Sequence, residues 1–359
     1  MDQEQLVSMA ALKFQNTTDS PDSPSMMFNS SDWQLVYAII PPYIFIVCLT
    51  GILGNAFVLL VFFLQRSRWS VPEIYLGNLA LADLVLLTCL PFWAMNILNS
   101  FYWAYGEFLC KAVSLSIIVN MYTSIYMLVM VNVDRYLALV LTIKARWLRR
   151  RRNAKAICVC LWLFGLCMGI TTAMYRTVQY VQSLQNVACI IIYPSDSWKV
   201  AHDLQLNLLG FALPLLAIIF CSYSIVKALQ QRRETVHAQD GNDQKATMLV
   251  CAVTLLFLVC WGPFHIITFL DVLCSFQVLD MRKWHHALDI GSQFSTYLAF
   301  LNSCLNPVLY VCTGHYFKRK VSDIYRRRKS SASSLVTTLQ RSVVSTYVQR
   351  SDQIKAVTL

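Results

Sequence analysis

Long apolar stretches, separated by short polar segments, run along most of this 359-residue chain. A helix needs about 20 mostly apolar residues to cross the hydrocarbon core of a bilayer. Seven stretches are long enough, at residues 35–64, 72–98, 107–141, 154–175, 198–229, 243–274 and 284–312. Each is expected to be helical, because backbone exposed to lipid must satisfy its own hydrogen bonds. The pattern therefore predicts an all-α bundle of seven transmembrane helices.

The composition also favours a membrane protein. Hydrophobic residues make up 57% of the chain and charged residues 14%, whereas charged residues make up about a quarter of a typical soluble protein. The net charge of +11 would suit either nucleic acid or an anionic membrane face. The basic residues gather in short loops on one side of the bundle, most densely at 149–152 and 326–329. Such loops face the cytoplasm, so we interpret them as topology signals and lipid contacts, not as a nucleic-acid surface.

The N-terminal segment lies on the other side. Residues 1–34 hold five acidic residues against Lys13 alone, with glycosylation sequons at Asn16 and Asn29. The segment has no basic stretch followed by an apolar core, so no cleaved signal peptide is expected and the first helix acts as its own anchor. We therefore expect a multi-pass plasma-membrane protein with its N-terminus extracellular and its C-terminus cytoplasmic.

One carboxylate, Asp83, falls near the middle of the second span. An ionisable group there is costly without partners and usually has a function. Asn120 and Ser124 share one face of the third span, and Asn302, Asn306 and Tyr310 repeat every four residues along the seventh. A seam of carboxylate, amides and hydroxyls suits a sodium ion, but it suits an inter-helix hydrogen-bond network equally well.

The third span ends in Asp134-Arg135-Tyr136, and Asp243 begins the sixth span on the same side. We expect Asp243 to form a second ion pair with Arg135, so that breaking the pair would couple movement of the sixth helix to the outside. Four prolines lie inside predicted helices and should kink them: Pro91, Pro214, Pro263 and Pro307.

Three of the 13 cysteines, Cys110, Cys189 and Cys274, fall on the outer side of the predicted bundle. Cys110 opens the third span, and Cys189 lies in the middle of the loop between the fourth and fifth. An oxidising compartment favours a disulfide between them.

Taken together, these motifs resemble the rhodopsin-like G-protein-coupled receptors over residues 35–325. The matching motifs are Gly54-Asn55, 79–83, 134–136, Trp162, Pro214, 260–263 and 306–310. The resemblance implies a switch in which Pro214, Ile125 and Phe257 lie below Trp261. It also favours sodium at Asp83, Asn120, Ser124, Asn302 and Ser303. The chain departs from the family at Ser222, where a tyrosine is usual, and no cysteine follows the seventh span.

The resemblance also divides the chain. It implies an extracellular segment at 1–34, the bundle at 35–314, a short amphipathic eighth helix at 315–328, opened by Phe317, and a disordered tail at 329–359. The tail is rich in Ser and Thr between residues 330 and 346. Phosphorylation by receptor kinases would suit arrestin there. The inner loops should contact a heterotrimeric G protein, mainly Gq/11 with Gi as a second partner.

Within this family the chain is most similar to the bradykinin (kinin) receptors. Ile117 stands where an amine receptor has a carboxylate, and Phe300 where a retinal protein has a lysine. Segments similar to kinin receptors lie at 73–79, 90–94, 176–177, 192–194, 207–211, 269–271 and 303–307. The runs at 51–60 and 257–261 favour the type 1, des-Arg-kinin subtype, although that subtype has a lysine where this chain has Ile118.

Asp271 and Asp289 sit at the outer ends of the sixth and seventh spans. Two nearby carboxylates would attract a guanidinium, and kinin peptides carry arginine at one or both ends. The alternative is two solvated surface acids; the resemblance favours ligand contacts. Further candidates for the ligand pocket are Trp93, Phe264, Gln293, Tyr297 and Arg176.

Three alternatives to a kinin receptor are considered. One is another peptide receptor of the same class, of the angiotensin or chemokine type, although residues 1–34 lack the cysteine usual in chemokine receptors. A transporter or channel is disfavoured because Asp83 is the single intramembrane charge and no internal repeat is found. An enzyme is disfavoured because no nucleophile–base pair or metal cluster stands out, and no organic cofactor is expected.

Overall fold

The computed structural model describes residues 31–65, 67–141, 145, 147–182, 184–235, 241–313 and 321–326. The predicted glycosylation sites Asn16 and Asn29 and the tail from residue 327 onward lie outside these residues. The side chains of Asp243 and Tyr310 also lie outside what is described, although their helices are included. The predicted Asp243–Arg135 pair therefore stays a prediction.

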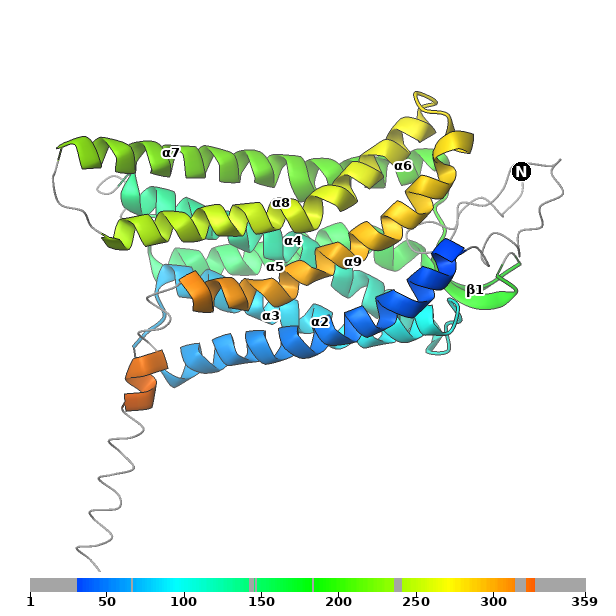
Figure 1. Cartoon of the computed structure of the whole chain (residues 1–359), viewed down its shortest axis with the longest axis horizontal. Helices are drawn as coiled ribbons and strands as arrows, with labels where there is room; N and C mark the ends of the chain where they lie inside the picture. Colours follow the sequence, from blue (N-terminus) through cyan, green and yellow to red (C-terminus); the bar gives the residue numbers. More distant parts are fainter. Residues whose placement is uncertain are drawn as a thin grey trace, which may run out of the picture.

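The described chain folds into long helices that lie side by side in an elongated bundle (Figure 1). The helices are α2 (Ser31–Leu64), α3 (Val71–Leu98), α4 (Gly106–Leu139), α5 (Arg151–Tyr175), α8 (Gly241–Ser275) and α9 (Met281–Thr313), with a fifth span made of α6 (Asp196–Asn207), η1 (Leu208–Ala212) and α7 (Leu213–Thr235). All seven predicted spans are confirmed as helices, with most ends within a few residues of the expected ones.

Six of these spans are both long enough and apolar enough to cross a membrane, within the part of the chain that the structure describes. The remaining helix, α9, has 33 residues, or about 50 Å at ~1.5 Å per residue, so its length also suffices. Its first turns carry Arg282, Lys283 and Asp289, which lower its apolarity at one end.

Buried side chains form three clusters along the length of the bundle. One contains Leu90, Trp93 and Tyr297 from α3 and α9, the next is built around Tyr122, Phe257 and Trp261, and a third around Tyr75, Leu79 and Met127. On the outside, α2 leaves large apolar side chains such as Ile46, Leu53 and Phe63 exposed. A soluble protein rarely exposes so continuous an apolar surface, whereas a helix in contact with lipid does so normally.

A β-hairpin, which the sequence did not predict, follows α5. Strands β1 (Arg176–Val181) and β2 (Asn186–Ile191) pair antiparallel, with Val178 opposite Cys189. The predicted disulfide between Cys110 and Cys189 is confirmed, with a Cα–Cα distance of 5.7 Å. It fastens the hairpin across the end of the bundle, beside the start of α4 (Figure 1).

The fifth span contains an irregular turn before Pro214. Residues 208–212 form the π-helical turn η1, and Tyr126 donates a hydrogen bond to the backbone oxygen of Leu209 (2.9 Å). Proline has no N–H to give to the preceding turn, so a hydroxyl from α4 takes up one of the carbonyls at this irregularity. A π-turn of this kind often marks a functional position.

Residues 321–326 form a short helical segment, where the eighth helix was expected. Val321 and Ile324, three residues apart on one face, pack against the cluster around Leu79 and Met127. The apolar face of an amphipathic helix is thereby attached to the end of the bundle.

Candidate ligand-binding and signalling sites

The centre of the bundle contains the predicted polar seam. Asp83 is completely buried and accepts hydrogen bonds from Asn120 Nδ2 (3.0 Å), Ser124 Oγ (3.3 Å) and Asn306 Nδ2 (3.0 Å). Asn120 also donates to Ser124 (3.0 Å). Helices α3, α4 and α9 thus meet at one carboxylate. All three donors are neutral, and no basic side chain of the described residues is paired with this carboxylate.

The remaining members of the seam are close at hand in α9. Asn302 and Ser303 are both buried, and the Ser303 backbone oxygen accepts a hydrogen bond from Asn55 Nδ2 (2.9 Å). The amide oxygens of Asn302 and Asn306 are buried with no hydrogen-bond partner among the described residues. Buried acceptors without a donor are costly, and they are the atoms that a bound cation requires. The residues present therefore fit sodium by charge and by donor type.

The predicted switch forms a single apolar cluster one layer away. Ile125, Phe257 and Trp261 belong to the same buried group, and Pro214 is buried in α7. Next to them, the ring of His265 stacks on Phe211 with centroids 4.7 Å apart. Sequence reasoning missed His265, because a single histidine in an apolar helix gives no local signal.

Near the C-terminal end of α4, Asp134 has a partner that was not predicted. Arg149, in the segment before α5, donates to both carboxylate oxygens through Nε (2.8 Å) and a terminal nitrogen (3.3 Å). The neighbouring Arg135 makes no ion pair with any other side chain of the described ranges. The ring of Tyr136 instead lies 5.6 Å from that of Phe220 in α7. The Asp-Arg-Tyr motif therefore connects α4 to the α4–α5 segment and to α7.

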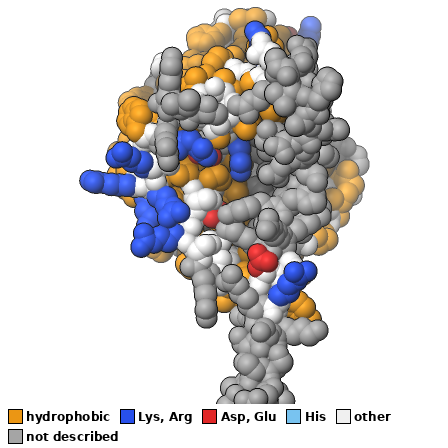
Figure 2. Space-filling view, turned by 90° about the vertical axis from the view of Figure 1, so that its left-hand side faces the viewer, with side chains coloured by type: hydrophobic (Ala, Val, Ile, Leu, Met, Phe, Trp, Pro, Cys, Tyr) orange, Lys and Arg blue, Asp and Glu red, His pale blue; other side chains and the backbone are white. Residues whose placement is uncertain are grey.

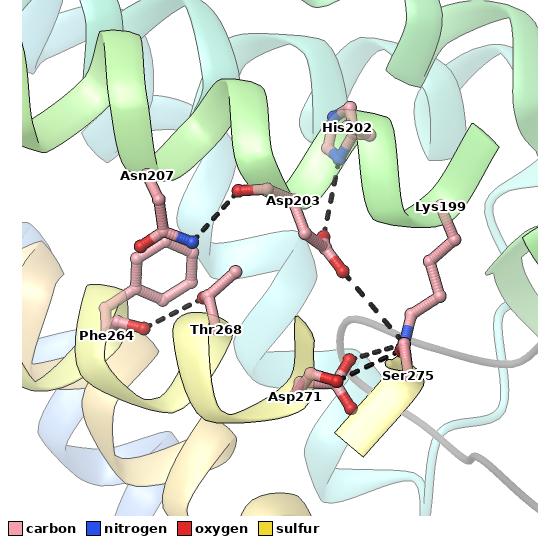
Figure 3. A network of polar contacts seen from close by, with 8 residues as sticks. All are labelled: Lys199, His202, Asp203, Asn207, Phe264, Thr268, Asp271 and Ser275. Carbon is pink, nitrogen blue, oxygen red and sulfur yellow. Dashed lines mark hydrogen bonds and ion pairs between the residues drawn. The ribbon is translucent and has the colours of Figure 1, made fainter. Parts of the chain in front are cut away.

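An ion pair joins the start of α6 to the C-terminal end of α8 (Figure 3). Lys199 Nζ forms an ion pair with Asp271 Oδ2 and lies 4.0 Å from Asp203 Oδ2. The side chains of Lys199 and Asp203 are 8% and 6% exposed, and that of Asp271 is 16% exposed. One ammonium is therefore held between two carboxylates of two helices in a largely dry environment. The expected acid is present at Asp271, but it already holds a cation of the same chain.

A histidine extends this network towards α5 and the loop after β2. His202 Nδ1 lies 3.7 Å from Asp203 Oδ1, and its other nitrogen lies 3.5 Å from the hydroxyl of Thr172. The ring of Tyr193 is 5.6 Å from the imidazole. Burial raises the pKa of Tyr193, with Asp203 adding to the effect. The site therefore couples α5, α6 and α8 through polar contacts.

Asp289, the second predicted acid, lies in α9. Its carboxylate is 3.4 Å from His285 Nε2, one turn earlier, and the side chain is 24% exposed. Close to it, a Cβ on Gly291 would come within 2.8 Å of Ile267 in α8. Glycine therefore lets α8 and α9 approach closely at this level, and Ile267 is one turn from Asp271. The two acids lie on adjoining helices at the same end of the bundle.

Arg176 and Trp93, which the sequence analysis named as candidates for the ligand pocket, lie next to each other. The Arg176 guanidinium lies 5.6 Å from the centroid of the Trp93 ring and donates to Ser114 Oγ (2.9 Å) and to the backbone oxygen of Cys189 (3.4 Å). Burial lowers the pKa of Arg176 to about 10, so the group stays cationic at neutral pH. These contacts hold the hairpin against α3 and α4, and a direct role in ligand binding stays a prediction.

The last three candidates line the interior of the same half of the bundle. Tyr297 donates to Gln293 Oε1 (2.8 Å) and accepts at its backbone oxygen from Tyr43 (2.9 Å). Phe264 is half-buried above Trp261, with ring centroids 6.1 Å apart. All three lie in the half of the bundle that holds Asp271 and Asp289, although each also packs in the core.

Lys199, Asp203 and His202 were missed from the sequence. The only local signal was a Lys and an Asp four residues apart, the spacing of an ion pair on one helix face. Their importance comes from Asp271, which is 72 residues away along the chain.

Comparison with known proteins agrees with the seven-helix architecture described above. Residues 54–310 match the model of the 7 transmembrane receptor (rhodopsin family). The chain is 40% identical to the B1 bradykinin receptor of Chlorocebus pygerythrus over 328 residues, covering 90% of this chain and 93% of that protein. It is 40% identical to that of Homo sapiens over 315 residues (87% and 88%), and 44% identical to that of Tupaia minor over 299 residues (82% and 84%).

The class is therefore that of multi-pass membrane receptors, not enzymes. Within it, the chain belongs to the bradykinin receptor branch of the rhodopsin family, and its similarity lies on the type 1 side.

Proposed function

We propose that this chain is a plasma-membrane receptor for kinin peptides, with its N-terminus and the β-hairpin outside the cell. Asp271 carries the proposal: a mostly buried carboxylate at the mouth of the bundle, in a family whose relatives are named for bradykinin. Asp289 on the adjoining helix supplies a second acid for an arginine of the ligand. The disulfide between Cys110 and Cys189 holds the hairpin next to this entrance.

The ligand's guanidinium would replace Lys199 at Asp271. A guanidinium offers a planar fork of donors that matches a carboxylate, whereas an ammonium is a compact point charge. Asp203 is already within 4.0 Å of Lys199, so the displaced ammonium has a second carboxylate on its own helix. The exchange leaves no charge buried without a partner, and it would release the outer end of α8 from α6.

Sodium is proposed at Asp83. The ion would be held by the carboxylate with Ser124 and the amide oxygen of Asn302, and it would supply the positive charge that the hydrogen-bond donors lack. Such an ion ties α3 to α4 and α9, and therefore favours the arrangement of helices in which it is bound.

Signalling is proposed to run along α8 to the inner end of the bundle. Pro263 interrupts the hydrogen bonds of α8 beside Trp261, which makes this helix the element best suited to pivot. The partners would be heterotrimeric G proteins, mainly Gq/11 with Gi as a second, followed by receptor kinases and arrestin at the Ser/Thr-rich tail.

Calcium release in cells that express the full chain tests the proposal. Intact bradykinin, its des-Arg form, angiotensin and a chemokine panel are applied separately, with surface expression verified. A response to a kinin that is lost in Asp271→Asn supports the proposal, and the more potent kinin assigns the subtype. Silence to both kinins with a response to angiotensin or a chemokine would instead favour another peptide receptor of the same family.

A further inference from the structure

A basic pocket lies at the opposite end of the bundle from the Lys199–Asp271 pair. It has a volume of about 860 Å³ and is lined by Arg68, Trp69, Ile74, Asn78, Arg151, Arg152 and Lys155. Figure 2 views this end and shows Lys and Arg side chains gathered beside apolar surface. The volume falls within the range of about 300–1,000 Å³ that is usual for small-molecule sites.

The four cations of this pocket have no acidic partner among the residues that the structure describes. Within the described part of the chain, Arg68, Arg151, Arg152 and Lys155 make no ion pair and no side-chain hydrogen bond, and no acid lines the pocket. By contrast, Arg149, a few residues away, is bonded to Asp134. Four like charges around one cavity repel each other and favour an anion that carries more than one negative charge.

Hydrogen bonds fix two residues of the pocket wall. Trp69 donates through Nε1 to the backbone oxygen of Phe62 (2.8 Å), and its ring covers Gly77, where a Cβ would come within 2.6 Å. Asn78, in the wall, accepts a hydrogen bond from Trp162 (3.2 Å). The start of α5 contributes its own partial positive charge, because its first turn holds no acid and no side chain caps it.

One face of α5 links the cations to the bilayer. Arg151, Lys155, Val159 and Leu163 follow each other at intervals of four residues, and all four side chains are exposed. The same face therefore changes from basic to aliphatic within about two turns. A ligand that satisfies both halves has a polyanionic head and an apolar tail.

We propose that this pocket binds the headgroup of a polyphosphorylated lipid, such as a phosphoinositide, in the membrane leaflet that faces the G protein. Basic pockets between transmembrane helices on the cytoplasmic side suit such headgroups. The lipid would bridge the α2–α3 loop and the start of α5, and so hold the Arg149 segment that bonds Asp134. The placement in the cytoplasmic leaflet rests on the proposed orientation; the pocket itself does not.

The test uses the full chain in phosphatidylcholine nanodiscs with a fluorescent phosphatidylinositol bisphosphate as probe. Both leaflets are accessible there, so binding is measured independently of orientation, kinin binding and signalling. We expect Arg151→Gln with Lys155→Gln to weaken binding about tenfold or more. The charge-matched control, Lys227→Gln with Arg326→Gln, removes two exposed cations elsewhere and should change affinity less than about threefold.

Two further arms make the result decisive. The charge-retaining pair Arg151→Lys with Lys155→Arg should bind like the original chain. If the glutamine pair does not fold, Arg68→Gln with Arg152→Gln replaces it in the same comparison. Equal losses in the pocket pair and the control pair would overturn the proposal in favour of diffuse surface charge. Soluble inositol trisphosphate is tested as a competitor of the lipid probe. If it competes as well as the intact lipid does, the proposal is overturned, because the aliphatic face of α5 would then contribute nothing to binding.

Discussion

The competition between Lys199 and the ligand at Asp271 leads to a prediction with a definite sign. If the Lys199 ammonium only competes with the ligand for Asp271, Lys199→Gln should strengthen the binding of a peptide that carries arginine. Two unit charges about 4 Å apart attract by about 4 kcal/mol at an effective dielectric constant of ~20. The loss of the Asp271 pair is offset in part, because Lys199 already lies 4.0 Å from Asp203 and can move closer to it. We therefore expect a net gain of about 1–2 kcal/mol, or about 5- to 30-fold in Kd.

Equilibrium binding of a radiolabelled kinin to membranes measures this effect. A second peptide, in which citrulline replaces arginine, keeps the shape but loses the charge, and its affinity should change less than about twofold in the variant. Lys111→Gln serves as the matched control, because Lys111 is also paired with an acid (Glu107, 2.6 Å) but on the exposed surface of α4. Weaker binding of the arginine peptide to Lys199→Gln would refute the reasoning and make Lys199 a residue that positions Asp271.

Three further predictions concern the other sites. Asp271→Ala combined with Asp289→Ala should weaken binding of the arginine peptide by about 2–4 kcal/mol, at about 1–3 kcal/mol for each charged bond; unchanged affinity at verified surface expression would contradict it. Asp83→Asn should abolish the effect of replacing sodium by choline on agonist affinity, and a persisting sodium effect would place the ion elsewhere. Asp134→Asn and Arg149→Gln should raise basal calcium release to similar extents, with no further rise in the double variant; additive effects would mean that the two groups act separately.

Helix positions were predictable because lipid imposes a simple rule. A span such as α2 needs only enough apolar residues, and the sequence of residues 35–64 displays them without interruption. The hairpin of β1 and β2 has no such rule. Its strands have six residues each, and the disulfide that attaches β2 to the bundle joins Cys189 to Cys110, 79 residues away along the chain.

A polar site could be predicted where one of its residues lies at a position in which burying a polar or charged group costs free energy. Asp83 could be found from its position alone, and its partners followed from helical spacing. The partner of Asp271 could not be predicted from the sequence, because the ammonium of Lys199 comes from another helix. Either residue alone resembles an ordinary surface charge. Asp134 illustrates the same limit: its partner is Arg149 in an irregular segment, where no periodicity constrains the side chain.

Two separate restraints act on α8, one an ion pair and the other apolar packing. At its outer end, Lys199 ties Asp271 to α6; near its middle, Trp261 and Phe257 pack against Ile125 of α4. Between the two lies Pro263, where the helix lacks a backbone hydrogen bond. Removing the outer restraint alone lets the outer segment of α8 move while the packed segment stays, and the bend at Pro263 takes up the difference. A ligand that exchanges its guanidinium for the ammonium would therefore act first on the angle of this bend, and the inner half of α8 would respond only once the packing around Trp261 rearranges. On this argument Lys199→Gln alone, with no peptide, should loosen the outer half of α8 without raising basal signalling.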